Sequence, residues 1–503
     1  MRAAGWMMCV ALAAGLCVSA IARAEDAATA AAVLQSTEIQ LADGVASVCG
    51  GDPARPAAPA AALVRAEGRH FRATDGRYVM LRGVNATGDA KIPPFKTLTS
   101  PALLDPLPGW GINTIRFLFT WEAFEPAPCD FREDYLAYYE QAVKWAAERG
   151  LYVIVDFHQD GFSRYALDGC GEGAPLWALT DRVTPALPDN GPNCAGWGSK
   201  ATFSPQNYTI FSRFFKNDKQ ALSHYLAMLK RVAARLSRYP NVIGYDMLNE
   251  PWTNAATLNP FYARAGSALR EMHPSAMLFF EPELPVIGPL LPVPLSGVRP
   301  PPLDNVVLAP HYYNGELFTL KLWLGDPPGL VLQQWKNKAD AWNIPMLLGE
   351  FGVFPEVRNS AAYIAAIYRW LDNGLVSATQ WSYTPGWTAQ AKDGWNMEDL
   401  SIVDDRMQLR AAVFKARPYP QKTAGRPLNF DLDGAGFGYR WHNNPDAAQG
   451  GGRTEFYLPA GYATGKTWRT APSWARVVCS LGSSGYQAVC QSDYRGAVSV
   501  ELR

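Results

Sequence analysis

Residues 151–160 have the sequence Leu151-Tyr152-Val153-Ile154-Val155-Asp156-Phe157-His158-Gln159-Asp160. The first half is a continuous apolar run, which is typical of a strand buried on both faces, as the strands of a parallel sheet are. The second half ends on the polar side chains of His158, Gln159 and Asp160. The stretch therefore predicts a buried parallel strand whose carboxyl end carries functional groups.

The same alternation of short apolar runs and amphipathic stretches extends from residue 78 to residue 382. Apolar residues recur at spacings of three and four in 136–146, 222–236 and 364–371, which predicts helices that bury one face. Strands that alternate with helices form parallel sheets. We therefore expect an α/β fold, a closed (β/α)8 barrel or TIM barrel, with strands at 79–85, 112–119, 152–157, 242–248, 277–281, 306–310, 346–349 and 378–382.

The sequence changes character after Phe414. A segment with Pro418 and Pro420 leads into short apolar runs at 455–458, 475–478 and 497–502, with glycine-rich turns and no helical pattern. This pattern is typical of a β-sandwich. We expect the aromatic residues of this part to lie in its core or at the domain interface; they include Trp441, Tyr457, Trp468 and Trp474.

The N-terminus has the order of a cleaved signal peptide, with Arg2, an apolar run over 5–16 and the motif Ala22-Arg23-Ala24. A membrane anchor is the alternative, but the run is shorter than the roughly 20 residues that a span requires. We therefore expect a secreted or periplasmic protein. Its predicted parts are a signal peptide (1–24), an Ala/Pro-rich leader or linker (25–62), the barrel domain (63–416) and a C-terminal β-sandwich domain (417–503).

The composition excludes several classes of partner. The 46 Lys and Arg residues balance 46 Asp and Glu residues, so nothing indicates a nucleic-acid partner or a polybasic membrane surface. The chain has 17 tryptophans, and an excess of tryptophan is typical of proteins that stack aromatic rings on sugars. We expect a monomer that binds a neutral ligand.

Six cysteines remain once the signal peptide is removed, and an even number fits disulfides formed in an oxidising compartment. Six cysteines allow about 15 pairings. No C-x-x-C motif occurs, so structural zinc is not expected. The favoured pairs are Cys170–Cys194 in one Gly/Pro-rich loop, Cys479–Cys490 across one hairpin and, by elimination, Cys49–Cys129.

The predicted strands end on polar residues, and functional residues of (β/α)8 proteins lie at those ends. Asn249-Glu250-Pro251 follows the fourth strand, and Glu350 follows the seventh. These strands face each other across a barrel, so their glutamates can form a pair. Retaining glycosidases need two carboxyl groups about 5 to 5.5 Å apart, one as acid/base and one as nucleophile. The pair therefore suggests the hydrolysis of a glycosidic bond.

Other strand ends add side chains to the same mouth, among them Arg116, His158, His311, Tyr313 and Trp381. A guanidinium and a tyrosine hydroxyl are suitable partners for an ionised nucleophile. In this order, the motifs of roughly residues 78–400 resemble glycoside hydrolase family 5. By that resemblance Glu250 is the acid/base and Glu350 the nucleophile. The resemblance also implies a subsite for the cleaved sugar formed by Arg116, His158, Asn249, His311, Tyr313 and Trp381, with Asn249 at the 2-hydroxyl.

Three further stretches resemble the endoglycoceramidase-like branch of that family: 156–165, 174–178 and 380–387. The C-terminal β-module adds to this resemblance. It implies that Lys91 and Asp160 contact the glucose next to the scissile bond. Trp177 is a candidate for stacking on sugar, with packing as the alternative, and Gly161 departs from the Val or Leu of the branch.

Two other arrangements of the polar residues are open. Glu281 and Glu283 form a second carboxylate pair after the fifth strand, but a supporting role is favoured because that strand is not opposite the seventh. His158 and His311 are alternative metal ligands with Asp160 and Glu250. No His-x-His or His-Glu-x-x-His spacing occurs, so we expect neither a metal nor another cofactor.

The resemblance implies a retaining glycosidase whose substrate joins glucose, or a glucose-terminated oligosaccharide, to a lipid such as ceramide. Apolar loops at 284–295 and 317–332 either pack on each other or cover that lipid, with transient contact to a membrane surface. One alternative is an endo-β-1,4-glucanase or mannanase acting on polysaccharide. Another is a non-catalytic carbohydrate- or lipid-binding protein, against which the carboxylate pair argues.

Overall fold

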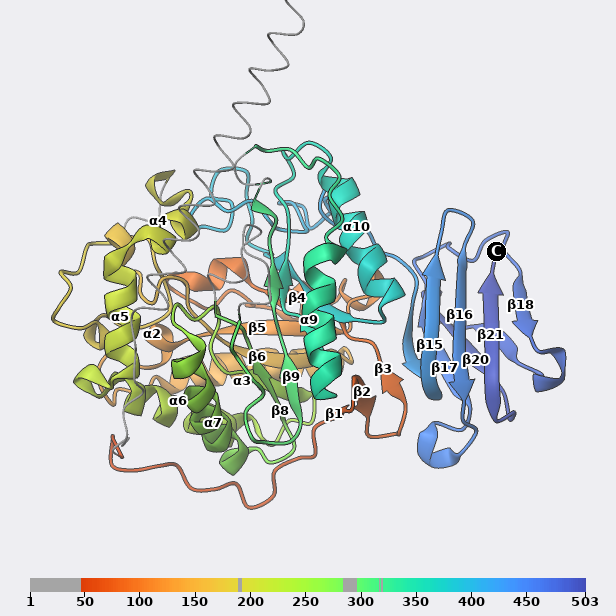
Figure 1. Cartoon of the computed structure of the whole chain (residues 1–503), viewed down its shortest axis with the longest axis horizontal. Coiled ribbons are helices and arrows are strands. Elements are labelled where there is room, and N and C mark those ends of the chain that lie inside the picture. The colour runs from red at the N-terminus through yellow and green to blue at the C-terminus, as the bar shows by residue number, and fades with distance from the viewer. Residues whose placement is uncertain (1–46, 189–191, 284–295, 316, 318–319) are drawn as a thin grey trace, which may run out of the picture.

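The chain forms a barrel and a β-domain that lie side by side (Figure 1). The structure is a computed structural model that describes residues 47–503 except 189–191, 284–295, 316 and 318–319. The predicted signal peptide, most of the leader and the apolar loop 284–295 therefore lie outside the described residues. Within the described part of the chain, no helix is both long enough and apolar enough to span a membrane.

The barrel is built from parallel strands in the order β11-β13-β4-β5-β6-β7-β8-β9. Leu308 forms a parallel bridge with Met346, and β10 (His311–Tyr312) pairs with β12 (Glu350–Phe351), so the sixth and seventh strands also meet. The predicted (β/α)8 barrel is thus confirmed. The strands are β4 (Arg82–Ala86), β5 (Thr114–Thr120), β6 (Tyr152–His158), β7 (Val242–Asp246), β8 (Met277–Phe280), β9 (Val306–Leu308), β11 (Leu347–Leu348) and β13 (Ser377–Tyr383).

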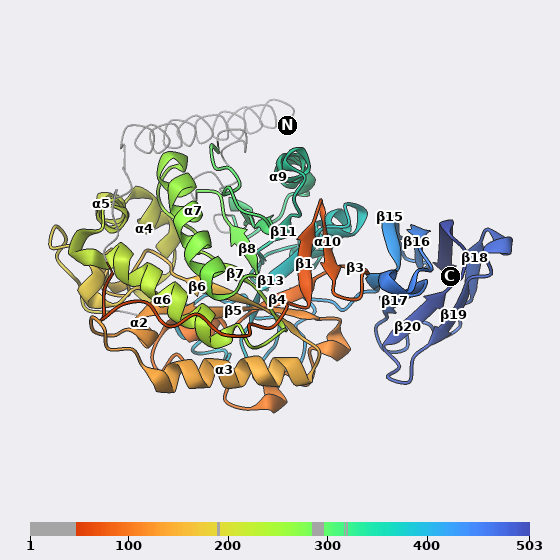
Figure 2. The same ribbon diagram turned by 90° about the horizontal axis from the view of Figure 1, so that it is seen from below.

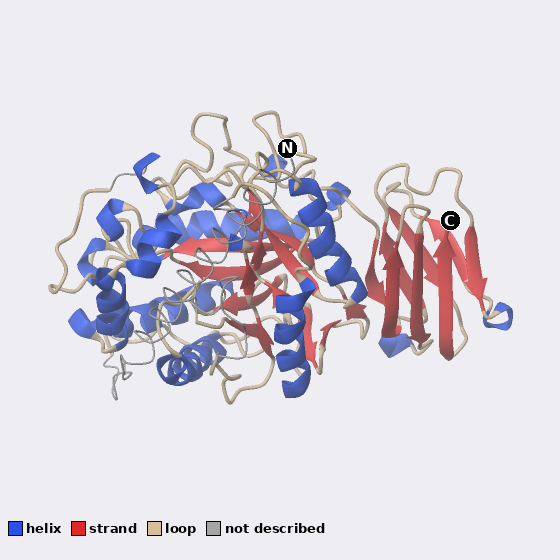
Figure 3. Cartoon of the chain, turned by 45° about the horizontal axis from the view of Figure 1, so that its top comes forward, coloured by secondary structure: helices blue, strands red, loops and turns tan. Residues whose placement is uncertain are grey.

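Helices surround the barrel strands (Figure 3). The periodicities at 136–146, 222–236 and 364–371 are confirmed as α3, α6 and α10, whose apolar stripes are buried against the barrel. The helices are α2 (Trp121–Phe124), α3 (Glu133–Glu148), α4 (Trp197–Phe203), α5 (Pro205–Phe215), α6 (Ala221–Leu236), α7 (Ala255–Met272), α9 (Gly329–Trp342) and α10 (Ser360–Asn373).

The strands β1 (Val64–Glu67), β2 (His70–Ala73) and β3 (Tyr78–Val79) close the amino-terminal end of the barrel. Val64 and Phe71 pack in one cluster with side chains of the barrel strands such as Ile154. β3 also pairs with β14 (Tyr419–Thr423) of the C-terminal domain. Residues 64–79, which the sequence assigns to the barrel, therefore also extend a sheet of the second domain, between the two bodies in Figure 2.

The C-terminal domain has two antiparallel sheets around a core that includes Trp441 and Phe456. Trp474 is 72% exposed, so the expectation of a core or interface position is wrong for this residue. The first sheet has the order β1-β2-β3-β14-β17-β20-β19 and the second β15-β16-β21-β18. The remaining strands are β15 (Gly425–Leu432), β16 (Phe437–Asn443), β17 (Arg453–Tyr457), β18 (Trp468–Ala471), β19 (Val478–Leu481), β20 (Gln487–Gln491) and β21 (Gly496–Leu502).

Disulfides tie loops to this framework. The favoured pairs Cys49–Cys129, Cys170–Cys194 and Cys479–Cys490 are all present. The second of these pairs closes the long segment that follows β6, on the face of the barrel where the strands end. This segment also carries Asp160 and Trp177.

Candidate active site

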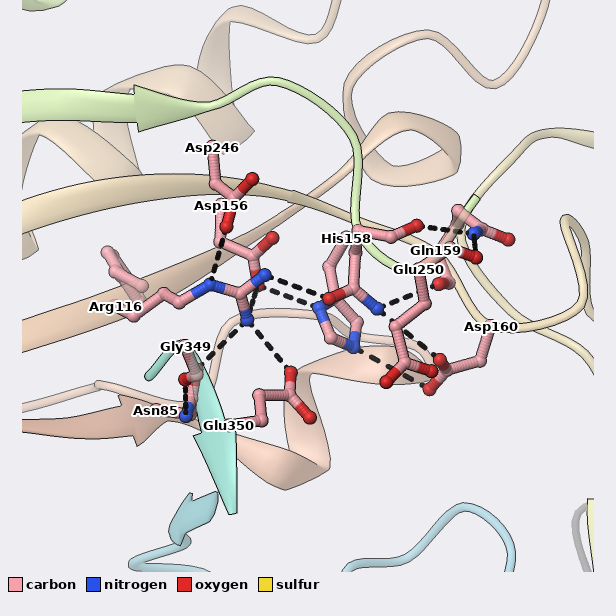
Figure 4. Close-up of polar contacts among 12 residues, drawn as sticks. Asn85, Arg116, Asp156, His158, Gln159, Asp160, Asp246, Glu250, Gly349 and Glu350 are labelled. Atoms are coloured by element: carbon pink, nitrogen blue, oxygen red, sulfur yellow. Dashed lines mark hydrogen bonds and ion pairs between the residues drawn. The ribbon is translucent and has the colours of Figure 1, made fainter. Parts of the chain in front are cut away.

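Arg116 lies at the centre of a polar network at the carboxyl ends of the barrel strands (Figure 4). Its side chain comes from β5 and is fully buried. The guanidinium therefore joins groups from several strands into one rigid cluster. Its partners are the carboxylates of Asp156 (2.8 Å), Asp246 (3.0 Å), Glu281 (3.1 Å) and Glu350 (2.9 Å) and the amide oxygens of Asn85 (3.0 Å) and Asn249 (2.8 Å).

The carboxylates around Arg116 place an excess of negative charge in a buried volume. Burial raises the pKa of Glu281 to about 8; His311 opposes this rise and Asp246 adds to it. Burial also raises the pKa of Asp246. Burial raises the pKa of Asp156, but the attraction of Arg116 and His158 together outweighs burial and lowers it. Glu281 is therefore mainly protonated at neutral pH, which reduces the charge of the network.

Glu350 is held by two donors. Nη1 of Arg116 donates to its Oε1 at 2.9 Å, and the hydroxyl of Tyr313 donates to its Oε2 at 2.9 Å. Burial and the carboxylate of Glu350 raise the pKa of the Tyr313 hydroxyl, which therefore remains a donor. With one donor on each oxygen, the carboxylate has a fixed orientation at the mouth of the barrel.

Glu250 follows β7 with a left-handed backbone, φ +40°, a conformation that is strained for a residue with a side chain. Hydrogen bonds hold this turn: Nε2 of Gln159 donates to the carbonyls of Asn249 and Glu250 at 2.6 and 3.1 Å. The amide of Glu250 donates to Oε2 of Glu281 at 2.9 Å. The surrounding groups therefore determine where the Glu250 side chain points.

His311 lies between the two predicted catalytic carboxylates. Its Nδ1 is 2.9 Å from Oε1 of Glu250 and 3.6 Å from Oε2 of Glu350. Burial lowers the pKa of the imidazole, but the neighbouring carboxyl groups of Glu281 and Glu350 together raise it above its usual range. Carboxylate oxygens of Glu250 and Glu350 lie within 4.8 Å of each other. The fold thus brings the two glutamates together.

A second group of predicted residues lies beside this pair. The rings of His158 and Trp381 stack with their centroids 5.3 Å apart. Nδ1 of His158 is 2.7 Å from Oδ2 of Asp156. Burial lowers the pKa of His158, but the carboxylate of Asp156 outweighs it and raises the pKa to about 10. His158 is therefore a cationic donor beside an aromatic surface.

Lys91 and Asp160, which come from different loops, form a buried ion pair. The Lys91 ammonium lies 4.3 and 4.1 Å from the ring centroids of Trp381 and Trp395. Nδ2 of Asn249 lies 3.4 Å from Oδ1 of Asp160, which links the ion pair to the Arg116 network. The structure thus brings Lys91, Asp160, Asn249 and Trp381 into one cluster.

Glu172 also belongs to this cluster. No sequence pattern predicts it as a site residue, because it lies in a glycine-rich loop and not at the end of a strand. It is fully buried, and neither carboxylate oxygen has a hydrogen-bond partner among the described residues. Its Oε1 is 3.6 Å from Nε2 of His158. Burial raises its pKa to about 8, against the attraction of His158. Asp156 and Asp246 are also missing from the predicted site, although a charged residue in an otherwise apolar strand is a usable signal.

The raised pKa values make stability depend on pH. The folded chain holds protons on Glu172 and Glu281 up to about pH 8, whereas an unfolded glutamate releases its proton near 4.5. The stabilisation is therefore complete below the unfolded pKa and is lost as the pH rises through the folded one. We expect Tm to fall between about pH 4.5 and about pH 8, and to fall less in Glu172→Gln. Thermal unfolding monitored by circular dichroism measures both slopes.

The exposed Glu148 on α3 provides the matched control, since its side chain is 64% exposed. Glu148→Gln should keep the pH slope of the unmodified chain. A Glu172→Gln variant with that same slope would contradict a proton held on Glu172.

Two candidate residues lie apart from the network. Trp177 packs edge-on against Trp121 and His224, and its Nε1 donates to the carbonyl of Glu125 at 2.9 Å. These are the contacts of a packing residue. Glu283 accepts from the Ser296 hydroxyl at 2.7 Å, whereas Glu281 binds Arg116. Only Glu281 of the second carboxylate pair therefore joins the Arg116 network, in the supporting position expected for it.

Several His and carboxylate side chains lie close enough together to be considered as metal ligands. In the cluster of His158, Asp160 and Glu172, the Lys91 ammonium already pairs with the Asp160 carboxylate. In the clusters that contain Glu350, the Arg116 guanidinium already pairs with the Glu350 carboxylate. A further group contains Cys49 and Cys129, whose sulfurs are joined in a disulfide. These donor sets already have internal cations or a covalent bond, so they fit a metal poorly.

Comparisons with known proteins agree with this geometry. The chain is 28% identical to endoglycoceramidase I of Rhodococcus hoagii over 89% of its own length and 91% of that protein. It is 34% identical to a glucosylceramidase of Aspergillus fumigatus over 23% of its own length and 18% of that protein. Its fold matches the structure of endo-glycoceramidase II from Rhodococcus sp. in complex with ganglioside GM3, with a TM-score of 0.72 and 24% identity, covering 87% of this chain and 99% of that one.

Two family models match the two domains. Residues 417–491 match the glycoside hydrolase family 5 C-terminal domain. Residues 73–386, more than half of the chain, match the cellulase model of glycosyl hydrolase family 5. This match spans the barrel strands and both glutamates, and the chain therefore belongs to glycosyl hydrolase family 5.

Proposed function

We propose that this chain hydrolyses, with retention of configuration, the β-glycosidic bond between glucose and a lipid aglycone such as ceramide. The glucose is either alone or at the reducing end of an oligosaccharide. The observation that carries the proposal is the separation of less than 4.8 Å between oxygens of Glu250 and Glu350. Inverting glycosidases hold their carboxyl groups about 6.5 to 9.5 Å apart to admit a water molecule, whereas retaining ones use about 5 to 5.5 Å.

The neighbours of the two glutamates assign their roles. Glu350, oriented by Arg116 and Tyr313, attacks the anomeric carbon, and the bond to the lipid oxygen breaks. Glu250 gives its proton to that oxygen, so the lipid leaves as an alcohol. In the second step Glu250 removes a proton from water, which attacks the anomeric carbon and releases Glu350. Configuration is inverted twice and so retained.

His311 and Glu281 support the acid/base residue. His311 contacts Glu250 through Nδ1 and lies 3.2 Å from Glu281 through Nε2. The strained backbone of Glu250 is held by the Glu281 carboxylate. These contacts fix the Glu250 side chain near the bond to be cleaved, which is the positioning that general acid catalysis needs.

The lipid part of the proposal is supported by the relatives named above and by the segment after β10. Leu317 and Leu332 of this segment are buried, but Leu320, Leu324 and Leu330 are 52%, 68% and 68% exposed, so part of its apolar surface faces outward. Exposed apolar patches beside a site are typical of lipid contact. We propose that the protein is secreted or periplasmic, acts as a monomer and meets its substrate at a membrane surface.

Comparing two substrates tests the proposal. We expect kcat/KM for a fluorescent glucosyl- or lactosylceramide in detergent micelles to exceed that for cello-oligosaccharides by about a hundredfold or more, because the apolar segment contacts only the lipid. Product release is followed by chromatography. Exclusive activity on cello-oligosaccharides or mannan would instead support the endo-glucanase or mannanase alternative, and no activity on any β-glycoside would support a binding protein.

A further inference from the structure

Glu172 is a buried carboxyl group that takes no part in the two catalytic steps described above. Its side chain is fully buried, and neither of its oxygens has a hydrogen-bond partner among the described residues. Burying a polar group without a partner costs free energy, so the stability of the fold does not explain this residue. Its surroundings indicate a different role.

The backbone around Glu172 gives its side chain one position. The amide of Glu172 donates to the carbonyl of Asp160 at 2.7 Å, and the amide of Asp160 donates to the carbonyl of Glu172 at 3.2 Å, which forms an antiparallel bridge. Gly173, with φ +113°, allows the close approach, because a Cβ there would lie 2.5 Å from Cβ of Gln159. The Cys170–Cys194 disulfide ties the same segment down. The carboxyl group is therefore held against the end of β6.

The carboxyl group of Glu172 faces the ring nitrogen of His158 that is still available. Nδ1 of His158 lies 2.7 Å from Asp156, whereas Nε2 has no hydrogen-bond partner among the described residues. Nε2 lies 3.6 Å from Oε1 of Glu172 and 3.6 Å from Oδ2 of Asp160, which is beside His158 in Figure 4. The two carboxyl groups thus flank this N–H without binding it closely, and it can donate to a substrate hydroxyl.

The charge on Glu172 determines how the charges around it are balanced. The cations Lys91 and His158 already pair with the carboxylates of Asp160 and Asp156. Burial raises the pKa of Glu172 to about 8, against the attraction of His158, so this acid is mainly neutral at neutral pH. At higher pH a third carboxylate faces the same two cations. The titratable groups around Glu172 are His158 and Asp156 on β6, Asp160 after it, Lys91 in the 3-10 turn Gly88–Lys91, Tyr135 on α3 and, on the far side of Lys91, Glu398.

We propose that Glu172 is a positioning residue for the substrate: as a neutral acid it leaves Nε2 of His158 to a sugar hydroxyl, and as a carboxylate it takes that N–H for itself. The inference rests on the proposed function, because it places the sugar beside the stacked rings of His158 and Trp381. It deepens that function by naming the residue that sets the highest pH at which the sugar is held correctly. Glu172 touches no reacting atom and acts through His158.

The imidazole resonances of protein labelled with nitrogen-15 histidine test this contact without a substrate. The chain has six histidines, and His158→Gln identifies the resonance of His158. This resonance should shift with a midpoint near pH 8 while the ring stays protonated, because the pKa of Glu172 is about 8 and that of His158 about 10. The absence of this step from the unmodified chain would overturn the proposal, whether or not any variant folds.

Glu172→Gln should abolish the step in the His158 resonance, because the amide keeps the size of the side chain and does not ionise. The resonance of His311 is the internal reference, because the carboxyl group 3.2 Å from its Nε2 is that of Glu281. It should titrate in Glu172→Gln as it does in the unmodified chain. A step of His158 that persists in this variant would contradict the assignment.

The pH dependence of kcat/KM measures the consequence for catalysis. A dinitrophenyl β-glucoside suits this measurement, because its leaving group departs without a proton and the ionisation of Glu250 does not limit the first step. Between about pH 7 and about pH 9, the loss of kcat/KM should be about tenfold smaller in Glu172→Gln than in the unmodified enzyme, since an acid with a pKa of about 8 is mostly ionised at the upper limit. At about pH 7 the two enzymes should agree within about twofold.

Glu125→Gln is the matched control, because Glu125 is also a fully buried glutamate beside a histidine, with Oε1 2.6 Å from Nδ1 of His224. It should show the full loss of the unmodified enzyme at high pH. An equal loss at every pH in Glu172→Gln would show a merely structural role, and an unaltered pH profile would show no role in binding; either result overturns the inference. Failure to cleave the aryl β-glucoside at any pH overturns the proposed function instead, while the His158 resonance still tests Glu172 by itself.

Discussion

Glu350→Gln is expected to lower kcat on an aryl β-glucoside by about 10⁴-fold or more, a loss typical of removing a nucleophile. The amide keeps the size of the side chain; its oxygen can still accept from Arg116, and its nitrogen can donate to the Tyr313 hydroxyl, so the network should stay in place. It cannot form the glycosyl ester, because an amide is a very poor nucleophile. Initial rates of aryl alcohol release measure the loss, and an unchanged Tm shows that the fold is intact.

Glu283→Gln provides the control for this experiment. Glu283 is also a buried glutamate that follows a barrel strand, but its partner is Ser296 rather than Arg116. Its replacement should change kcat by less than about threefold, since it touches no reacting group. Similar losses in both variants would mean that Glu350 acts through the stability of the mouth and not as the nucleophile.

Stereochemistry gives a second measurement for Glu350. In Glu350→Gly, azide can occupy the space of the lost carboxylate and attack the β-glycoside from that side. We expect an α-glycosyl azide, since a single displacement inverts configuration. Nuclear magnetic resonance of the product distinguishes the anomers. A β-glycosyl azide from this variant would place the nucleophile elsewhere.

Glu250→Gln is expected to have the second largest effect, with a loss in kcat of about 10² to 10⁴-fold for a glycolipid. A lipid alcohol is a poor leaving group and needs the proton of Glu250, whereas an acidic nitrophenol leaves without it. The first step on a nitrophenyl glucoside should therefore be nearly normal, and the glycosyl-enzyme should accumulate as a burst of phenol. Rapid-mixing kinetics with both substrates measure this difference.

The anomer formed with azide gives a second test of Glu250. In Glu250→Ala the glycosyl-enzyme still forms on Glu350, and azide attacks it without needing a general base. The expected product is a β-glycosyl azide, the opposite anomer to that from Glu350→Gly. If both substrates lost equal activity and azide had no effect, Glu250 would be a positioning residue, and Glu281 would be the next candidate for the acid.

The fold was largely predictable because each barrel strand carries a local signal. The strand predicted at 152–157 is observed as β6, which is one residue longer, and the helix predicted from the periodicity over 222–236 is observed as α6. The short strands were harder to predict from the sequence. Val79 is predicted as the first residue of the first barrel strand, but it forms with Tyr78 a separate strand that pairs with Lys422 and Thr423. Two residues carry too little periodicity to reveal a partner more than 300 positions away in sequence.

The site was predictable where a residue directly follows a strand. Glu250 lies four residues after β7, and His311 and Glu350 begin β10 and β12 just beyond β9 and β11, so barrel geometry sends all three to one mouth. Glu172 could not be found in this way, because it comes from a loop whose path depends on the Cys170–Cys194 disulfide and on tertiary packing. Trp177 shows the reverse case. Its motif suggested sugar contact, but its ring and its N–H are engaged by Trp121, His224 and Glu125.

The sequence by itself determined the barrel and the pair of glutamates, because apolar periodicity and strand ends are local properties. Only the tertiary structure decided the cysteine pairing, the separation of Glu250 and Glu350, the central place of Arg116 and the burial of Glu172 beside His158. These features depend on distances between segments far apart in the chain, and those distances are set by how the strands close and how buried charges find partners.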